Sequence, residues 1–306
     1  MKVYHQPVLL SEVISFLNIQ PNHWYIDCNL GGGGHTGEIL KRGGRVLGID
    51  LDPDAISEVA KNFNLTIQKR DQRLFAESKN LIIYQSNFTE IKSIVKQFNI
   101  QKVDGILFDL GVSSYQLETK DRGFSFNLNA PLDMRMDKQS LVTATDLING
   151  LHESELAELF FKLGEERFAK RIAKKIVEHR QLKKIETTDQ LAKIILAVRP
   201  KNRLDRTHPA TRVFQALRIA INDELNSLKI ALPETLDVLN PNGRLVVLTF
   251  HSLEDRIVKN FFKDQEKKSL IEVLNKKPIT PTEEEVLNNP RSRSGKLRVA
   301  EKLLSL

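Results

Sequence analysis

The sequence predicts an α/β fold in which a parallel sheet is interrupted by a helical insertion. Short apolar stretches typical of strands alternate with helical patterns, which is the order expected of a parallel sheet. The fourth and fifth stretches are separated by a long segment whose middle part, residues 144–196, has helical spacing and no convincing strand. The five predicted strands are residues 24–28, 45–50, 81–85, 103–109 and 244–250.

The apolar residues of the insertion recur at helical intervals. They include Leu156, Leu159, Phe160 and Leu163, and further along Ile172, Ile176 and Val177. Pro200 and the polar run 201–206 are typical of a return linker, followed near His208 by a helix that precedes the fifth strand. We therefore expect a sheet domain built from residues 1–134 and 208–306 and a helical domain at 135–207. The tail, 276–306, contains two further candidate strands.

Composition excludes several classes of protein. The chain has 306 residues, 41% hydrophobic and 28% charged, which argues against a disordered, collagen-like or membrane-spanning chain. A single cysteine, Cys28, excludes an intramolecular disulfide framework and a cysteine-based metal cluster, and fits a reducing, cytoplasmic compartment. The net charge of +7 favours a polyanionic partner without identifying one.

A glycine-rich loop, residues 31–37, follows the first predicted strand and opens a helix. Glycines let a ligand approach the backbone, and the helix start presents N–H donors. The spacing of Gly32, Gly34 and Gly37 fits a dinucleotide fingerprint. The spacing of Asp27, Gly31 and Gly33 fits a loop that holds S-adenosylmethionine, and a merely tight turn is a third reading.

Polar and aromatic side chains follow the other strands. Asp50 ends the second strand, where a carboxylate can accept both ribose hydroxyls of either cofactor, whereas Asp52 or Asp54 fits better as a helix N-cap. Phe88 follows the third strand and is placed either to stack on adenine or to pack in the core. The fourth strand ends at Asp109, and Ser113, Ser114 and Gln116 follow it, which suits an amine methyl acceptor better than hydride transfer.

Long and unusual strings in this chain resemble the RsmH/MraW family of bacterial 16S rRNA cytosine N4-methyltransferases. The resemblance runs nearly from end to end. The strings are residues 5–13, 33–35, 109–116, 122–126, 131–137, 164–167, 208–216, 250–256 and 289–294. One departure is Asn29, which stands where the family usually has Thr.

The resemblance implies a class I (Rossmann-like) S-adenosylmethionine-dependent methyltransferase sheet with an inserted helical domain. It implies methylation of the N4 amine of a specific cytidine in the decoding region of 16S rRNA. The RNA is expected as the partner within the 30S subunit or a late assembly intermediate, a homodimer is allowed, and no membrane is involved. The family's cofactor contacts transfer to Gly33, Gly34, His35, Asp50, Phe88, Asp109 and Gln116.

The proton acceptor for the amine is left open. Asp109 is a candidate by position, but as a transferred cofactor contact it can also be fully occupied by the cofactor. A DNA amino-methyltransferase is the alternative enzyme, although the Pro-Pro string of that class is missing here, and a noncatalytic RNA-binding protein is the alternative outside enzymes.

Substrate contacts are expected near the returning part of the sheet domain. The candidates are His208 and Arg212, together with His251 and Arg256; the reading of residues 254–256 as the start of a helix stays open. The two histidines are not spaced like a zinc site, so no metal is expected. Phosphates could be met by three basic segments: Lys170, Arg171, Lys174 and Lys175; Arg199, Lys201, Arg203 and Arg206; Arg291, Arg293, Lys296 and Arg298.

Overall fold

The computed structural model describes residues 7–205 and 207–304 and divides into two compact units. Unit 1 consists of Met1–Ser113 and Leu225–Leu306, and unit 2 of Ser114–Glu224. Two residues singled out from the sequence, His5 and Arg206, lie outside the described part of the chain. Across the described residues, the structure has no helix that combines the length and apolar character needed to span a lipid bilayer.

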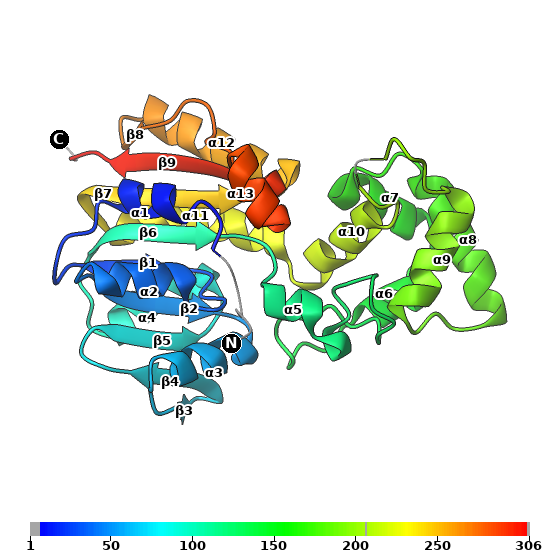
Figure 1. Ribbon diagram of the computed structural model, residues 1–306, viewed down its shortest axis with the longest axis horizontal. Coiled ribbons are helices and arrows are strands. Elements are labelled where there is room, and N and C mark those ends of the chain that lie inside the picture. Colours follow the sequence, from blue (N-terminus) through cyan, green and yellow to red (C-terminus); the bar gives the residue numbers. More distant parts are fainter. Residues whose placement is uncertain (1–6, 206, 305–306) are drawn as a thin grey trace. The chain divides into compact units, whose positions relative to one another are not determined.

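Unit 1 is built on a nine-stranded sheet with the order β3-β4-β5-β2-β1-β6-β7-β9-β8 (Figure 1). The five central strands, from β5 to β7, are parallel, and the strands at both edges are antiparallel to their neighbours. The strands are β1 (Trp24–Asp27), β2 (Arg45–Asp50), β3 (Gln68–Arg70), β4 (Arg73–Glu77), β5 (Leu81–Gln85), β6 (Val103–Asp109), β7 (Leu239–Thr249), β8 (Ile271–Val273) and β9 (Lys296–Lys302).

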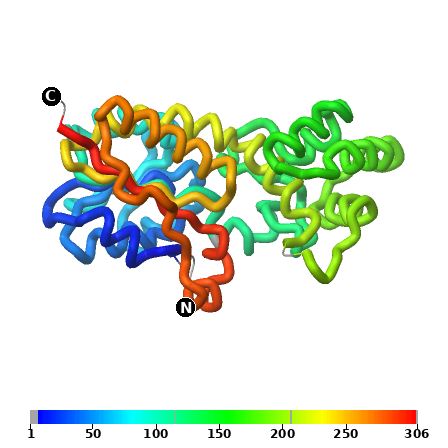
Figure 2. The backbone as a smooth tube through the Cα atoms, turned by 90° about the horizontal axis from the view of Figure 1, so that it is seen from above, coloured from blue at the N-terminus to red at the C-terminus, as the bar shows by residue number. Residues whose placement is uncertain are grey.

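Helices cover both faces of this sheet, so the central strands are buried on both sides, as parallel sheets require. One face packs against α1 (Leu10–Leu17), α2 (Gly34–Lys41) and α3 (Pro53–Asn62). The other packs against α4 (Ile91–Gln97), α11 (Glu224–Val238) and α12 (Ser252–Lys267). Figure 2 shows the first set in blue and α11 and α12 in yellow to orange on the opposite side. Unit 1 also contains α13 (Glu283–Asn288) and the 3₁₀ turns η1 (Phe88–Glu90) and η3 (Pro290–Ser294).

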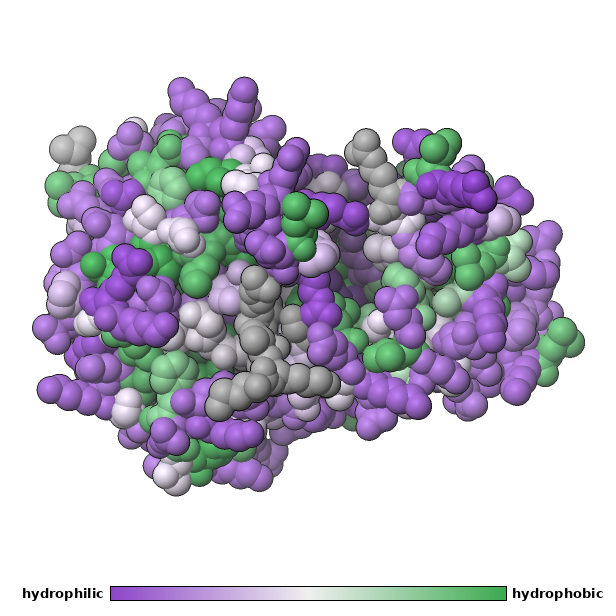
Figure 3. Space-filling model, viewed as in Figure 1, coloured by the Kyte–Doolittle hydropathy of each residue, from purple (hydrophilic) through white to green (hydrophobic). Residues whose placement is uncertain are grey.

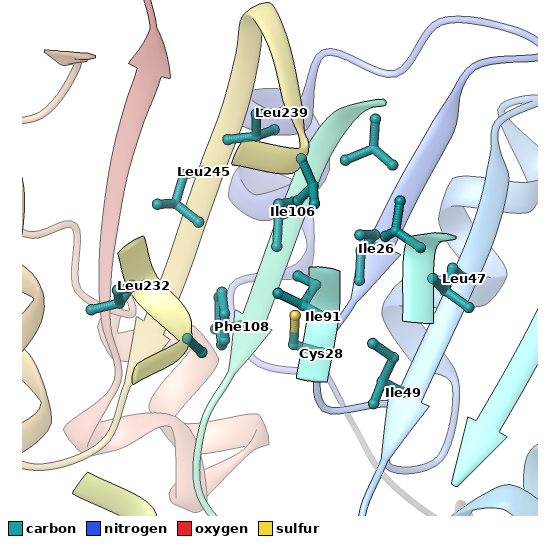
Figure 4. Close-up of a cluster of buried hydrophobic side chains, with 14 of the residues drawn as sticks. Ile26, Cys28, Leu47, Ile49, Ile91, Ile106, Phe108, Leu232, Leu239 and Leu245 are labelled. Carbon is teal, nitrogen blue, oxygen red and sulfur yellow. The ribbon is translucent and has the colours of Figure 1, made fainter. Parts of the chain in front are cut away.

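Side chains alternate between the two faces along each strand. On β1, Ile26 lies in the cluster on the α4 side, whereas Tyr25 lies in the cluster on the α1 side. Figure 4 shows Ile26, Leu47 and Ile106 from three adjacent strands lying side by side. All three are completely buried, so the hydrophobic effect fixes the register that places the strand ends at one edge.

Unit 2 is helical, as the spacing of its apolar residues predicts. Buried Leu156 and Phe160 on α7 and Ile172 and Ile176 on α8 are among the residues that the pattern selected. The helices are α5 (Ser114–Glu118), α6 (Ala144–Gly150), α7 (Glu153–Gly164), α8 (Ala169–Leu182), α9 (Thr188–Val198) and α10 (Thr211–Ile221), with the 3₁₀ turn η2 (Lys120–Arg122).

Unit 2 is larger than the predicted 135–207 insertion. Residues 120–134 are tied to its helices, because Thr188 accepts a hydrogen bond from the backbone N–H of Ala130 and Asn222 donates to the carbonyl of Met134. The helix after His208, α10, also belongs to unit 2, and the helix that leads into the fifth predicted strand is α11. The compact units therefore have other bounds than the predicted domains, which divide at 134 and 208.

The sheet also contains strands that the sequence did not predict. A hairpin of β3 and β4 turns at Asp71 and Gln72, both with positive φ (49° and 65°). β7 begins five residues before the predicted strand, at Leu239, and residues 240–243 bulge out of its pairing with β6. In the tail, only β9 lies within 276–306; its partner β8 precedes that segment.

Candidate functional site

The predicted cofactor residues of unit 1 follow the carboxyl ends of parallel strands. The glycine loop follows β1, Asp50 ends β2, Phe88 follows β5 and Asp109 ends β6. These four strands are neighbours in the order β5-β2-β1-β6, so their ends share one edge of the sheet. In open α/β sheets, ligands bind at this edge.

The glycine loop turns sharply from β1 into α2. Gly33 has a φ of 77°, in the left-handed region, and is the N-cap of α2 without providing a side-chain cap. A Cβ on Gly34 would lie 2.3 Å from Cγ of Pro7, so a side chain there would displace the segment before α1. The start of α2, at Gly33 and Gly34, thus presents backbone without side chains, which suits binding of an anionic group.

Asp50 connects the end of β2 to this loop. Its Oδ2 accepts a hydrogen bond from the N–H of Gly31 at 2.9 Å, and its Oδ1 accepts one from the N–H of Asp52 at 2.9 Å. Burial, together with the charge of Asp52, raises the pKa of Asp50 to about 7. Each carboxylate oxygen has a second lone pair, so the group can still accept hydrogen bonds from ligand hydroxyls.

The N-cap of α3 is Asp52, the acid that follows Asp50 by two residues. Oδ1 of Asp52 accepts a hydrogen bond from the N–H of Asp54 at the start of α3. The expectation that Asp52 or Asp54, rather than Asp50, caps this helix is confirmed for Asp52.

Asp27 is a buried acid at the end of β1. The hydroxyl of Thr36, on α2, donates to its Oδ2 at 2.8 Å. Burial raises the pKa of Asp27 to about 6, while the charge of His35 and the Thr36 hydrogen bond limit the rise. Thr36 had no sequence signal as a site residue, because only the fold turns its hydroxyl toward β1.

His35 and Asp109 join the glycine loop to β6. Nδ1 of His35 lies 3.4 Å from Oδ2 of Asp109, and the side chains are 4% and 9% exposed. Burial lowers the pKa of His35, but the hydrogen bond and charge of Asp109, together with the charge of Asp27 and a hydrogen bond to the backbone of Val8, outweigh burial, so that the pKa is raised. Two of the transferred cofactor positions are therefore in direct contact with each other.

Phe88 and Asn29 complete the described residues at this edge. The ring of Phe88 packs edge-on against Phe108, with centroids 5.4 Å apart, and is partly buried against the core. Oδ1 of Asn29 is buried with no hydrogen-bond partner among the described residues. An unsatisfied buried acceptor just before the glycine loop is consistent with a ligand donor at this place.

The remaining cofactor position and two substrate candidates lie in unit 2. Gln116, on α5, is 6% exposed. The imidazole of His208 stacks on Phe126 with ring centroids 4.6 Å apart, and burial lowers the pKa of His208. Arg212, at the start of α10, is exposed and donates from Nη1 to the carbonyl oxygen of Glu165.

The other two substrate candidates, His251 and Arg256, lie at the start of α12 in unit 1. Nδ1 of His251 accepts from the N–H of Glu254, and the Glu254 carboxylate accepts from the N–H of His251, which together form a capping box. Residues 254–256 therefore lie near the start of this helix, as the structural reading of the string expects, and His251 is its N-cap. Arg256 is exposed on the same helix.

The three basic segments differ in how many of their cations form ion pairs within the protein. Arg199 pairs with Asp205 at 3.0 Å, and Arg298, only 6% exposed, pairs with Asp255 at 2.6 Å. These two arginines stabilise the fold. Exposed cations remain in each segment: Lys170, Arg171, Lys174 and Lys175; Lys201 and Arg203; Arg291 and Arg293.

Comparison with known proteins identifies the family. The family model described as "MraW methylase family" matches residues 2–303. A ribosomal RNA small subunit methyltransferase H from Carboxydothermus hydrogenoformans is 46% identical and covers 99% of both chains. A second one, from Brevibacillus brevis, is 44% identical, again over 99% of both chains.

A solved structure of an rRNA methylase from Streptococcus thermophilus aligns with 98% of both chains, at 10% identity and a TM-score of 0.44. The family match and the curated relatives confirm the family that the sequence motifs indicated. The chain belongs to the MraW methylase family.

Proposed function

We propose that this chain methylates the RNA of the small ribosomal subunit. The observation that carries the proposal is the similarity over the whole chain to ribosomal RNA small subunit methyltransferases, which spans both units. S-adenosylmethionine, the methyl donor of this methylase family, supplies a methyl group on a sulfonium centre.

The residues at the edge of the sheet fit this donor. The Asp50 carboxylate, held by the N–H groups of Gly31 and Asp52, is placed to accept the ribose hydroxyls. The first turn of α2, reached over Gly33 and Gly34, is placed to meet the carboxylate of the methionine part. Phe88 presents a ring after β5 that suits contact with adenine, and Gln116 is the remaining contact that the resemblance implies.

The acceptor in this proposal is the N4 amine of one cytidine in the decoding region of 16S rRNA. Its lone pair is delocalised into the ring, so an acceptor hydrogen-bonded to the amine would localise that pair. The acceptor would take the proton as the N–C bond forms and the bond between the methyl carbon and the sulfonium sulfur breaks, which leaves a neutral thioether. Asp109 is the candidate for this step, although its contact with His35 equally supports a positioning role. His208, Arg212, His251 and Arg256 are the proposed contacts to the RNA.

The substrate is the RNA within the 30S subunit or a late assembly intermediate, and the enzyme acts in the cytoplasm, as a monomer or a homodimer. The experiment is transfer of labelled methyl from S-adenosylmethionine to unmodified 30S subunits, naked 16S rRNA and DNA, followed by nucleoside mass spectrometry. N4-methylcytidine in RNA is the expected product. Methylated DNA, or cofactor binding without any transfer, would contradict the proposal.

A further inference from the structure

The exposed face of the first half of α8 carries only basic side chains. Its buried face consists of Ala169, Ile172, Ala173 and Ile176, none more than 3% exposed. Between Glu166 and Glu178 the sequence contains no acid. The exposed side chains in this interval include five cations, which we call the α8 basic face: Arg167, Lys170, Arg171, Lys174 and Lys175.

Neighbouring helices of unit 2 pair opposite charges four residues apart, whereas the exposed charges four residues apart in the first half of α8 have the same sign. Glu158 and Lys162 form an ion pair on α7, and Asp189 and Lys193 form one on α9. On α8, the positions one turn apart are Lys170 with Lys174 and Arg171 with Lys175, and like charges at this spacing repel.

Internal partners relieve little of this repulsion. Lys175 pairs with Glu178 at 3.1 Å, whereas Arg167, Lys170, Arg171 and Lys174 form no ion pair with any residue that the structure describes. The exposed faces of α7 and α9, in contrast, carry charges of both signs. The α8 basic face is therefore suited to an external polyanion.

The position of the cations within the helix strengthens this inference. The N-terminal end of a helix carries the positive end of its dipole, which disfavours cations there. The first turn of α8 contains no acid, and its N-cap, Phe168, makes no side-chain cap. The preceding acid, Glu166, is 1% exposed and turned inward, where it accepts from the N–H of Phe168 at 2.8 Å and lies 3.7 Å from Arg199.

An exposed aromatic ring lies beside the cations. Phe168 is 37% exposed, and the guanidinium carbon of Arg171 lies 5.7 Å from the centre of its ring. Cations interleaved with an aromatic ring are typical of surfaces that track a nucleic acid backbone and stack on unpaired bases. In Figure 3, hydrophilic side chains predominate over the part of unit 2 where Figure 1 places α8.

We propose that the α8 basic face binds phosphates of the substrate RNA. The proposal rests on the RNA methylation proposed above and extends it to a defined surface. A lipid bilayer is disfavoured as the occupant, because the apolar face of α8 is already buried within unit 2 and is not free to insert. An acidic protein is the competing occupant that the experiment must exclude.

The test compares two double variants that each remove two exposed lysines one helical turn apart. Lys170→Ala/Lys174→Ala removes cations from the α8 basic face, and Lys263→Ala/Lys267→Ala removes the same charge from the C-terminal end of α12 in unit 1, away from Arg256. Alanine is a good helix former, so both variants should fold, which circular dichroism checks. The probe is naked 16S rRNA, with affinity measured at several salt concentrations.

The α8 variant should bind this RNA about tenfold more weakly at physiological salt, and the slope of log K against log salt should shrink by about 1.4. The α12 variant should stay within about twofold of the unaltered protein. In methyl transfer, the α8 variant should raise KM for RNA and leave kcat at saturating RNA and S-adenosylmethionine affinity unchanged.

Equal losses in the two variants would overturn the proposal by showing a mere effect of net charge. Unchanged RNA affinity in the α8 variant, while the unaltered protein methylates RNA, would also overturn it and leave an acidic protein as the occupant. If the unaltered protein neither binds nor methylates RNA, the proposed function fails as a whole, which separates the two failures.

Discussion

The imidazole of His35 faces the carboxylate of Asp109 across 3.4 Å, and both side chains are at least nine-tenths buried. The pair links the first turn of α2 to the end of β6, so the glycine loop and the fourth parallel strand are held together by a contact between two transferred cofactor positions. We therefore expect the charge state of this pair to affect the binding of a ligand at the loop.

Removing the carboxylate should lower the pKa of His35. In Asp109→Asn, the charge of Asp109 no longer opposes the effect of burial, which lowers the pKa, so the pKa of His35 should fall from its raised value. A raised histidine pKa contributes stability below pH 6.5 that is lost as pH rises through the folded-state value. The variant should therefore lose more unfolding free energy at pH 6 than at pH 9.

An NMR titration of the imidazole measures the shift, and Asp104→Asn, at the other end of β6, should leave the pKa of His35 unchanged. An unaltered His35 pKa in Asp109→Asn would contradict the assigned cause. Retention of kcat in the same variant would exclude Asp109 as the proton acceptor.

A second pH effect is predicted at Asp27. Its pKa, raised from 3.8 to about 6, means that this carboxyl contributes stability below pH 3.8 that is lost as pH rises through about 6. Asp27→Asn removes the buried charge. The hydroxyl of Thr36 and the N–H of Asn29 both contact the carboxylate of Asp27, and the new amide can donate to the first and accept from the second. The stability of the variant relative to the original chain should rise by up to about 3 kcal/mol between pH 4 and pH 7.

Chemical denaturation across that pH range, without cofactor, provides the measurement. A difference between the two proteins that does not change with pH would show that Asp27 is not protonated in this window.

Asp50→Ala should weaken S-adenosylmethionine binding about 10- to 100-fold, because it removes a charged acceptor. It also leaves the N–H groups of Gly31 and Asp52 without the acceptor that positions the loop. Isothermal titration calorimetry measures the affinity. Unchanged affinity would remove Asp50 from the ribose-binding role.

The matched control for this substitution is Asp104→Ala. That carboxylate accepts a hydrogen bond from Asn240 at 3.0 Å and pairs with His23 at 3.0 Å, but it lies at the start of β6 rather than at a carboxyl end. It should lower stability while leaving cofactor affinity intact, so it separates a general loss of fold from a loss of the binding group.

His251→Asn tests whether this residue contacts RNA in addition to capping α12. Asparagine is a good N-cap, so the free energy of unfolding should change by no more than about 0.5 kcal/mol. If the proposed substrate contact exists, kcat/KM for RNA should fall about tenfold. An unchanged kcat/KM would limit His251 to its capping role.

The buried part of the fold could be predicted from sequence, and the exposed part could not. Strands β2, β5 and β6 have the predicted bounds because continuous apolar runs are typical of strands buried on both faces. Strand β3 was missed because all three of its residues are polar and exposed, and its turn at Asp71 and Gln72 lacks the usual glycine signal.

A different division holds for the site, where the contacts that were missed are buried. Sequence motifs located Asp50 and His35, whose neighbours are fixed by strand order and a short loop. They did not reveal that Thr36 reaches Asp27 or that His251 and Glu254 bond reciprocally, because such contacts depend on side-chain direction within the fold. The boundaries of unit 2 could not be predicted from local sequence patterns either. The side chain of Asn222 forms hydrogen bonds to the backbone of residues 134 and 136, more than eighty positions away in the sequence.

The packing of unit 2 gives the last prediction, at two glycines that each end a helix. A Cβ on Gly164, the last residue of α7, would lie 2.5 Å from the carbonyl oxygen of Arg212 on α10, whereas a Cβ on Gly150, the last residue of α6, would meet nothing within 4 Å. Gly164→Ala should force α7 and α10 apart and lower the free energy of unfolding by about 1 to 3 kcal/mol.

Gly150→Ala should be neutral or raise the free energy of unfolding by up to about 1 kcal/mol, because alanine favours the helix more than glycine does. Thermal and urea unfolding of the two variants provide the comparison. Equal stability of both would show that α7 and α10 are not in the close contact that places Arg212 beside the end of α7, and the position of this substrate candidate would have to be revised.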